Sequence, residues 1–379
     1  MTTYIHGFSA VCAQGCGIEQ ITRNLFCHPQ QPKIITFSLD DEERCVNYFS
    51  AFECNRLSLT ELAESIAKHI NTTLKQCGWQ ASELANIPIF LASTSFSMSS
   101  HEIDFMNKGK DQLTKLCAEQ MFSLNEVSSE LKKILPNIYV INVATSCTSS
   151  TNAMIYAHRY LTLNIIEKAI VVGFESFNSV TLSGFYSLGL LTDQFLAPFS
   201  QESRGLILGE GIACIAMSSK PNNHTPLYRL VDGLSHCDAS NITTTSAQNL
   251  VGLMQSLLVK SSVEQPLIQA IKVNATGCPI NDNVEQQSLL ASFEQVPPLL
   301  FLKPYIGHTL GASGVLEVIL LLLCFNHQQL PKPVKYSNHS VPNLMNEYCL
   351  ANDLPSGYYL LNYLGFGGNN ASLLLELSQ

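Results

Sequence analysis

The chain has 379 residues, of which 46% are hydrophobic and only 13% are charged, and its formal net charge is −9. This balance argues against nonspecific nucleic-acid binding, because no cluster of lysines or arginines is visible. The length allows one large domain or two to three ordinary ones. So low a charged fraction also indicates that part of the surface is covered, most simply by a partner subunit.

The composition gives no sign of a membrane segment or of export. Residues 1–7 have neither the charged region nor the long apolar stretch of a signal peptide. The longest apolar run, Val315 to Phe325, is interrupted by Glu317 and is too short to span a bilayer. The 13 cysteines are scattered without metal-type pairs, which is typical of reduced thiols. We therefore expect a cytoplasmic protein without a metal site.

Strand-like and helix-like runs alternate along the chain, which predicts an α/β protein with central sheets covered by helices. The strand-like runs are residues 89–91, 138–143, 169–173, 212–217, 270–273, 299–302, 357–361 and 371–377. The helix-like runs are residues 59–74, 111–135, 151–163, 247–259, 283–294 and 311–325. Residues 328–342, with three prolines, are expected to form an extended surface excursion.

The order of strand, turn and helix in the first part of the chain is loosely echoed in the second, which hints at a duplication with two sites facing each other. The turn cluster Pro221 to Pro226 is the best boundary between the two parts. We therefore divide the chain into an N-terminal half, residues 1–222, and a C-terminal half, residues 223–379.

Cys147 lies in the segment Val143 to Ser150, between an apolar run and a helix-like run. A helix N-terminus offers free N–H groups and a partial positive charge, which favour a thiolate and can stabilise an oxyanion. Most cysteines are better explained as buried packing residues. The position of Cys147 nevertheless predicts a nucleophile whose thiolate form is favoured.

Three further segments carry candidate site residues. Lys303 to Gly314 holds His308 in a turn of small residues before an apolar helix, where backbones can approach closely. Asn362 to Ala371 has glycines suited to a tight turn between strands, and it could also line a pocket. Pro198 to Gly211 is a weaker signal, typical of a turn into a strand. Alone, each segment has an ordinary structural explanation.

In this order and spacing the four segments resemble the β-ketoacyl-ACP synthases of the thiolase-like superfamily, from Tyr4 in the first strand to Leu373 in the last. The resemblance implies a duplicated five-layer αβαβα fold and an obligate dimer. It also implies acyl transfer to a cysteine, decarboxylation of malonyl-ACP and carbon–carbon bond formation. No cofactor is implied beyond the phosphopantetheine arm that an acyl carrier protein delivers.

The resemblance also assigns roles to residues. Cys147 matches the acyl-accepting nucleophile, and Lys303 and His308 match the family's lysine and second catalytic histidine. Phe366 matches a gating aromatic beside the cysteine. Glu285 matches a glutamate near the lysine, and this pairing would keep Lys303 charged and oriented.

One departure from the family pattern decides the functional prediction. Active members read Asn-Ala-His-Gly-Thr-Gly-Thr-Pro where this chain reads Asn-Ala-Thr-Gly-Cys-Pro, so Thr276 stands in place of the first catalytic histidine and the loop is two residues shorter. Loss of one hydrogen-bond donor to a developing oxyanion typically costs about 10²–10³ in rate. The shorter loop also moves its neighbours. A further family histidine, in an Asp-Ala-x-His segment, is replaced by Asn241.

An incomplete site on this fold resembles the chain-length-factor subunits of type II polyketide systems, which pair with a competent ketosynthase and help shape its acyl tunnel. Most such factors lack the cysteine, whereas this chain keeps Cys147 and one histidine and lacks the other histidine. This mixed pattern is similar to that of the factor-like subunits of bacterial aryl-polyene clusters. We therefore predict a subunit that is impaired in condensation and forms a heterodimer with a Cys-His-His ketosynthase. Residues 97–122 are expected to contribute to the partner's tunnel, and an acidic carrier protein is expected to dock mainly on the partner.

Two alternatives stay open. The chain could be an autonomous 3-oxoacyl-ACP synthase that uses Cys147, His308 and Lys303 to condense acyl and malonyl-ACP, with Thr276 or Cys278 as a weak substitute donor. A variant of this hypothesis keeps only acyl loading or decarboxylation. The chain could also be a structural paralogue with an inert Cys147, which fast and selective alkylation would argue against.

Overall fold

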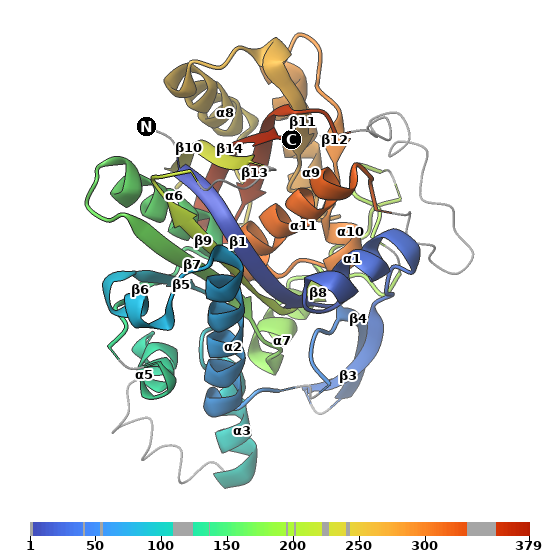
Figure 1. The fold of residues 1–379 in the computed structure, drawn as a ribbon. Coiled ribbons are helices and arrows are strands. Elements are labelled where there is room, and N and C mark those ends of the chain that lie inside the picture. The colour runs from blue at the N-terminus through green and yellow to red at the C-terminus, as the bar shows by residue number, and fades with distance from the viewer. Residues whose placement is uncertain are drawn as a thin grey trace.

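The structure is a computed structural model that describes residues 3–40, 42–53, 56–108, 124–135, 137–194, 196–200, 202–221, 227–239, 243–331 and 354–379. One long mixed sheet runs through the molecule, with helices on both of its faces (Figure 1). Its first half consists of β1 (Thr3–Cys12), β5 (Ile89–Ala92), β6 (Val140–Val143), β7 (Lys168–Glu175) and β9 (Gly211–Ser218). Its second half consists of β10 (Leu227–Cys237), β11 (Ile268–Lys272), β12 (Leu299–Leu300), β13 (Gly357–Leu364) and β14 (Asn369–Ser378).

The two halves of the sheet have the same strand order and the same strand directions. The first half runs β6-β5-β7-β9-β1 and the second runs β12-β11-β13-β14-β10. In each half the outer three strands are parallel and the inner two pair in antiparallel fashion. Antiparallel pairing of β1 with β10 joins the halves. This repeat confirms the predicted duplication, whereas the predicted boundary falls on residues 222–226, outside the described residues.

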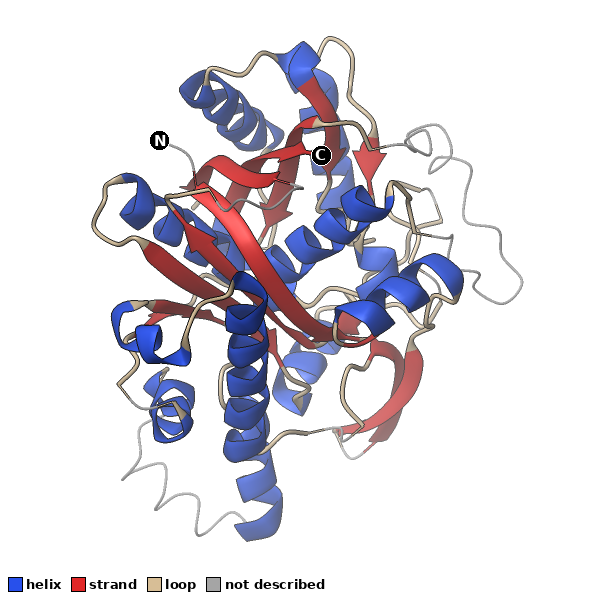
Figure 2. Cartoon of the chain, in the orientation of Figure 1, coloured by secondary structure: helices blue, strands red, loops and turns tan. Residues whose placement is uncertain are grey.

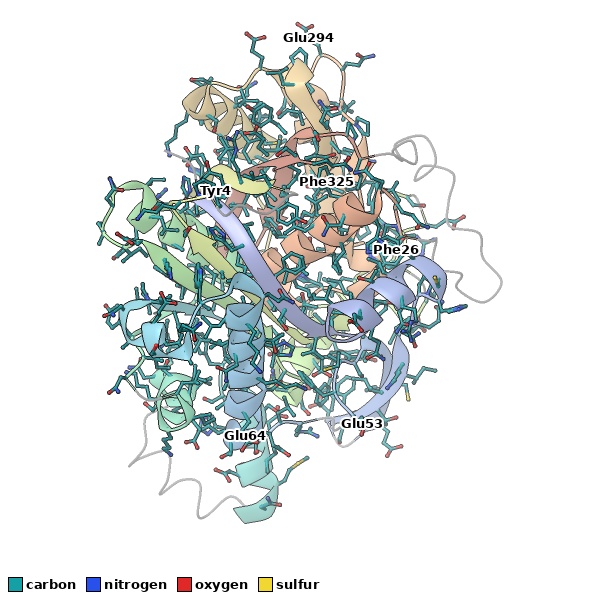
Figure 3. The ribbon with its side chains drawn as sticks, in the orientation of Figure 1. Tyr4, Phe26, Glu53, Glu64, Glu294 and Phe325 are labelled. Atoms are coloured by element: carbon teal, nitrogen blue, oxygen red, sulfur yellow. The ribbon has the colours of Figure 1, made fainter. Side chains whose placement is uncertain are left out.

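The helices complete a five-layer αβαβα arrangement, as the resemblance predicts. Helices α6 (Ser149–Thr162) and α11 (Ser313–His327) pack on each other in the middle layer, and α6 contacts strands of both halves of the sheet. Helices α2 (Leu59–Cys77) and α5 (Asn125–Ile134) cover one outer face, and α8 (Ala247–Ser261) and α9 (Pro279–Ser292) cover the other. The middle layer is buried from both sides, as Figure 3 shows for Phe325 of α11 in contrast to Glu294 at the periphery.

The local sequence explains the contrast between outer and middle helices. Helix α2 is amphipathic, begins with a capping box between Ser58 and Glu61, and ends at Gly78 in the left-handed conformation. Helix α11 is apolar on all sides from Val315 to Phe325 except at Glu317, because both of its faces are covered. The stretch Leu310–His327 is long and apolar enough to cross a membrane by length and composition, but 89% of it is buried inside the protein, as in a core helix.

Several elements escaped the sequence prediction. A separate small sheet holds β3 (Lys33–Leu39), β4 (Glu42–Phe49) and β8 (Leu208–Gly209), visible in Figure 2. The others include β10 of the long sheet, β2 (Gly15–Cys16), α1 (Ile18–Cys27), α3 (Met98–Lys108), α7 (Ser179–Ser187) and α10 (Lys303–Ile306). Of the helix predicted over residues 111–135, the described part is α5. Most of the surface excursion predicted over residues 328–342 lies outside the described residues.

The N-terminal ends of α6 and α11 approach each other closely. The backbone N–H of Val315 donates a 3.2 Å hydrogen bond to Ser150 Oγ. A Cβ atom on Gly314 would overlap the backbone nitrogen of Thr151, and one on Gly173 of β7 would lie 2.7 Å from Ser150 Cβ. Only residues without side chains therefore fit between the two helices and the strand.

We predict that Gly314→Ala destabilises the fold by about 1–3 kcal/mol, because the added methyl group overpacks the contact between the two central helices. Gly252→Ala in α8 is the matched control, since nothing lies within 4 Å of its Cβ position. That control substitution should stabilise the protein by about 0.5–1 kcal/mol, because alanine loses less conformational entropy than glycine when the helix folds. Urea denaturation followed by circular dichroism measures both, and equal effects of the two substitutions would contradict the steric argument.

Candidate active site

Cys147 lies in the turn that links β6 to α6. Ser146, just before it, has a φ of 54°, a conformation that non-glycine residues rarely adopt outside tight, functional turns. The turn is closed by hydrogen bonds from Thr148 N–H to Thr145 C=O (3.3 Å) and from Ser149 N–H to Ser146 C=O (3.1 Å). The thiol is thereby placed at the start of α6, as predicted, but its side chain is almost fully buried.

His308 occupies the equivalent turn of the second half, between α10 and α11. Its backbone is fixed on both sides, since His308 N–H donates to Ile207 C=O (2.7 Å) and Gly209 N–H donates to His308 C=O (3.0 Å). The imidazole Nδ1 lies 3.4 Å from Ser313 Oγ. Burial, followed by the charges of Lys303 and Lys272, holds the pKa of His308 well below its usual value. The ring is therefore a neutral hydrogen-bonding group.

The structure brings four of the predicted residues together around one small pocket, namely Cys147, Thr276, His308 and Phe366. The pocket volume is about 20 Å³, room for about one water molecule. The Phe366 ring stacks on Phe185 of α7, with ring centroids 5.3 Å apart and an angle of 11° between the planes. The aromatic predicted to gate the cysteine thus packs against a second ring at this pocket.

Lys303 and Glu285 lie behind the pocket, and their pairing differs from the prediction. Lys303 Nζ contacts Glu317 Oε1 at 2.8 Å and Asn274 Oδ1 at 3.2 Å. Glu285 instead accepts the backbone N–H groups of Asn274 (2.8 Å) and Ala275 (2.9 Å). Glu285 therefore shapes the strand end that leads to Thr276, and Glu317 of α11 is the carboxylate that orients Lys303.

Sequence reasoning missed two buried charges of the site, Lys272 and Glu317. Lys272 Nζ contacts Glu317 Oε2 at 2.5 Å and lies 3.4 Å from the centroid of the Tyr363 ring. Burial alone would raise the pKa of Glu317, but the charges of Lys272 and Lys303 outweigh burial and hold this pKa below its usual range. A signal was available, because each of these two charged residues stands alone in an apolar run.

The predicted preference of Cys147 for the thiolate is wrong in this structure. Burial raises the pKa of Cys147 to about 11, although a backbone hydrogen bond at Phe366 and the charge of Lys303 act in the opposite direction. Loss of solvation of the thiolate therefore outweighs the stabilisation expected at a helix N-terminus.

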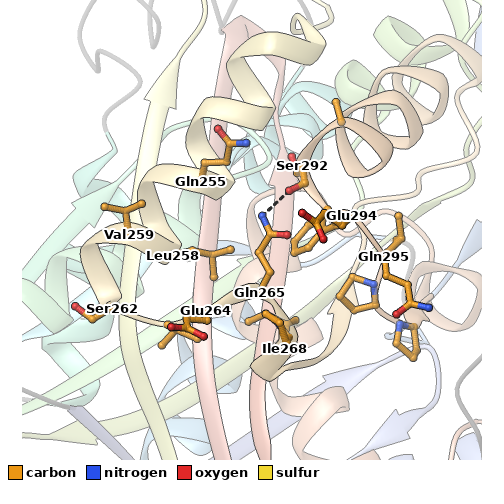
Figure 4. Close-up of a pocket in the computed structure, with 17 residues that line it drawn as sticks. Gln255, Leu258, Val259, Ser262, Glu264, Gln265, Ile268, Ser292, Glu294 and Gln295 are labelled. Atoms are coloured by element: carbon orange, nitrogen blue, oxygen red, sulfur yellow. Dashed lines mark hydrogen bonds between the residues drawn. The ribbon is translucent and has the colours of Figure 1, made fainter.

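Two other predicted features lie outside the site as described. Asn241 is not among the described residues, and of the segment 97–122 the described part ends with α3. A much wider surface groove, of about 1500 Å³, lies between the end of α8, the segment after it and the end of α9 (Figure 4). It is crossed by a 2.7 Å hydrogen bond from Gln265 to the backbone of Ser292 and contains none of the predicted site residues.

The sequence matches family models for both domains of one enzyme family. The N-terminal domain of β-ketoacyl synthase matches residues 125–222, and the C-terminal domain matches residues 231–337. Relatives include 3-oxoacyl-[acyl-carrier-protein] synthase 2 of Coxiella burnetii, 24% identical over 259 residues, which are 62% of this chain and 61% of that protein. Compactin diketide synthase of Penicillium citrinum is 25% identical over 257 residues, but these are 62% of this chain and only 10% of that protein. The matched region thus spans less than two thirds of these relatives.

Solved structures share the fold over essentially the whole chain. A ketosynthase in complex with its chain length factor from Xenorhabdus doucetiae matches with a TM-score of 0.79 and 21% identity, covering 100% of this chain and 98% of that one. The ishigamide ketosynthase/chain length factor matches with a TM-score of 0.79 and 19% identity, covering 99% of this chain and 98% of that one. A β-ketoacyl synthase from Burkholderia phymatum matches with a TM-score of 0.80 and 18% identity over both whole chains. The predicted thiolase-like fold is therefore confirmed.

We predict that Cys147 reacts slowly with iodoacetamide at pH 7.5. With a pKa of about 11, its thiolate fraction is about 10²–10³ times smaller than that of an ordinary thiol. The exposed Cys16 and Cys237 serve as internal references, and peptide mapping by mass spectrometry gives all rates from one sample. The rate at Cys147 should keep rising with pH up to about 11. Labelling of Cys147 ahead of the exposed cysteines would contradict the effect of burial.

We further predict that Glu317→Gln destabilises the protein by about 3–5 kcal/mol, because two buried lysines lose their shared counter-charge. Glu167→Gln is the control, since its pair with Lys220 is largely exposed and should be worth less than about 0.5 kcal/mol. In the wild type, the contribution of ionised Glu317 to the free energy of unfolding should be fully present above the usual pKa of a glutamate. It should disappear as the pH falls through the lowered pKa of Glu317. Urea unfolding at several pH values measures this, and equal stability of the two variants would contradict it.

Proposed function

Because the chain belongs to the β-ketoacyl synthase family, we propose that it is the chain-length-factor-type subunit of a ketosynthase pair. In this proposal a competent 3-oxoacyl-ACP synthase subunit performs the condensation, and this chain shapes the acyl tunnel of the pair. The chemistry is that of a type II polyketide or aryl-polyene system. The described cysteines are free thiols, which agrees with the reducing conditions of the cytoplasm.

The proposal rests on the sequence resemblance by which Thr276 matches the position of the first catalytic histidine of active members. Thr276 lines the pocket together with Cys147 and His308. Its Oγ1 accepts a 3.3 Å hydrogen bond from Cys278 N–H, and a hydroxyl carries no positive charge. Among the described residues that line the pocket, His308 is the single imidazole, and it is neutral. A site with one donor fewer is expected to condense about 10²–10³ times more slowly.

The size of the pocket supports the same conclusion. Pockets that hold small-molecule ligands have volumes of about 300–1,000 Å³. The space beside Cys147 is about 20 Å³, and the Phe366–Phe185 stack forms part of its wall. Neither an acyl chain nor a phosphopantetheine arm fits there without rearrangement. In the proposal, an acyl carrier protein therefore delivers its arm to the partner's site.

An open sheet edge offers a place for the partner. Among the described strands, β6 pairs with β5 on one side only, and it forms one end of the long sheet. Such an edge presents free N–H and C=O groups to a second chain. Exposed apolar side chains flank β6, namely Ile134 and Tyr139, and the chain as a whole has few charges. A permanent hetero-complex on this edge is expected to bury more than about 2,000 Å².

Intact-mass spectrometry tests the proposal. The chain is purified by itself and, separately, after co-production with a Cys-His-His ketosynthase from the same organism. Each preparation is then incubated with acyl-ACP and malonyl-ACP. We expect a two-carbon-extended 3-ketoacyl-ACP only from the pair. Extension by this chain alone would establish the alternative, an autonomous synthase that uses Cys147, His308 and Lys303. Acylated Cys147 without product would mean acyl loading only.

A pair of cysteine variants provides the control. Cys147→Ala in this chain should leave product formation by the pair unchanged, because the partner supplies the nucleophile. Alanine at the nucleophilic cysteine of the partner should abolish product formation. If Cys147→Ala abolished product formation by a pair that still assembles, the chain would be a catalytic subunit and the proposal would be wrong.

A further inference from the structure

Lys272 is a second buried cation next to the candidate active site. It is the last residue of β11, its side chain is fully buried, and its ammonium group contacts one oxygen of Glu317. Lys303 contacts the other oxygen of the same carboxylate. Burying an ammonium group is costly unless it is paired, and a cation over an aromatic face gains further stabilisation. The Tyr363 ring, 3.4 Å from Lys272 Nζ, provides such a face.

Titratable groups on four elements contact Lys272 or act on its charge. They are Glu317 on α11, Lys303 on α10, Glu285 on α9 and Tyr363 on β13. Glu285 is occupied by two backbone N–H groups at the end of β11. Among the described residues, Glu317 is therefore the one carboxylate that directly contacts both lysines. Two ammonium groups share one bridging carboxylate, so the cluster carries a net positive charge when both lysines are protonated.

This charge acts on the imidazole of His308. Burial is the largest cause of the low pKa of His308, and the charges of Lys303 and Lys272 add to it. Burial also lowers the pKa of Lys272, but its contact with Glu317 acts in the opposite direction and favours the protonated ammonium. A protonated His308 would then lie in a buried site near two cations.

We propose that Lys272 is a positioning residue that shares Glu317 with Lys303 and keeps His308 a neutral hydrogen-bonding group instead of an acid. It acts through the chain of contacts from Lys272 to Glu317, Lys303 and Asn274, the last of which lines the pocket with His308. This role does not depend on whether the chain condenses substrates or only supports a partner.

NMR of the histidine rings tests the role of Lys272 directly. The full chain is labelled at its histidine side chains, and His308→Gln identifies the His308 signal. In the wild type this signal should stay that of a neutral ring through the pH range in which exposed histidines titrate. In Lys272→Met the titration midpoint of His308 should move to higher pH, because one of two nearby positive charges is gone. Methionine keeps the length of the lysine stem in the core.

Two comparisons separate charge from packing. In Lys272→Met combined with Glu317→Gln, one positive and one negative charge are removed together, so the midpoint should return toward that of the wild type. The buried His158, which faces Asp232 and Lys260, is an internal reference and should not shift. A wild-type His308 that titrates near pH 6.5 would overturn the proposal without any variant. So would a midpoint that moves in Lys303→Met but not in Lys272→Met.

Discussion

The close approach of α6 and α11 at their N-terminal ends is the constraint on which the site depends. Each helix follows the outermost strand of its own half of the sheet, so the residues just before the two helices occupy equivalent positions. Cys147 precedes one helix and His308 precedes the other. Gly314 and the hydrogen bond from Val315 to Ser150 let the helices meet at backbone distance. The duplicated fold thereby converts two remote turns into one pocket.

Burial and the helix N-terminus compete at Cys147, and their magnitudes decide the outcome. A helix N-terminus favours an anion by about 0.3–1 kcal/mol at exposed sites. Full burial can shift a pKa by about 3–5 units, each worth about 1.4 kcal/mol. A cysteine at the start of a helix is therefore activated only where solvent or a positive group reaches its sulfur. Here Phe366 packs at the pocket, and Lys303 is paired with Glu317.

The parts of the fold that the sequence predicts well are those with continuous apolar runs, such as β7, β9 and α11, because burial on both faces leaves no polar side. Strand β3 was missed because most of its residues are exposed, and β4 was missed because it begins with a run of charged side chains, Glu42 to Arg44. The motifs also predicted which residues share the pocket. They did not predict the partner of Lys303, because sequence spacing shows which residues are buried but not which buried charges meet. Glu285 and Glu317 are equally plausible on spacing alone, and only the folded structure, which brings Lys272 and Lys303 to the carboxylate of Glu317, selects Glu317.

The two kinds of polar residue at this site differ in what their loss costs the fold. In the proposed function Thr276 takes the place of a pocket histidine. Its hydroxyl oxygen accepts a hydrogen bond from Cys278 N–H, so the fold would lose little by this replacement while a catalytic donor would be absent. Removing Glu317 leaves two buried lysines without their shared counter-charge, which costs about 3–5 kcal/mol. A chain that no longer condenses substrates would therefore still need its lysines and their carboxylate to stay folded. Glu317 and the two lysines thus serve the stability of the fold, whereas in the proposed function the residue at position 276 sets the chemistry.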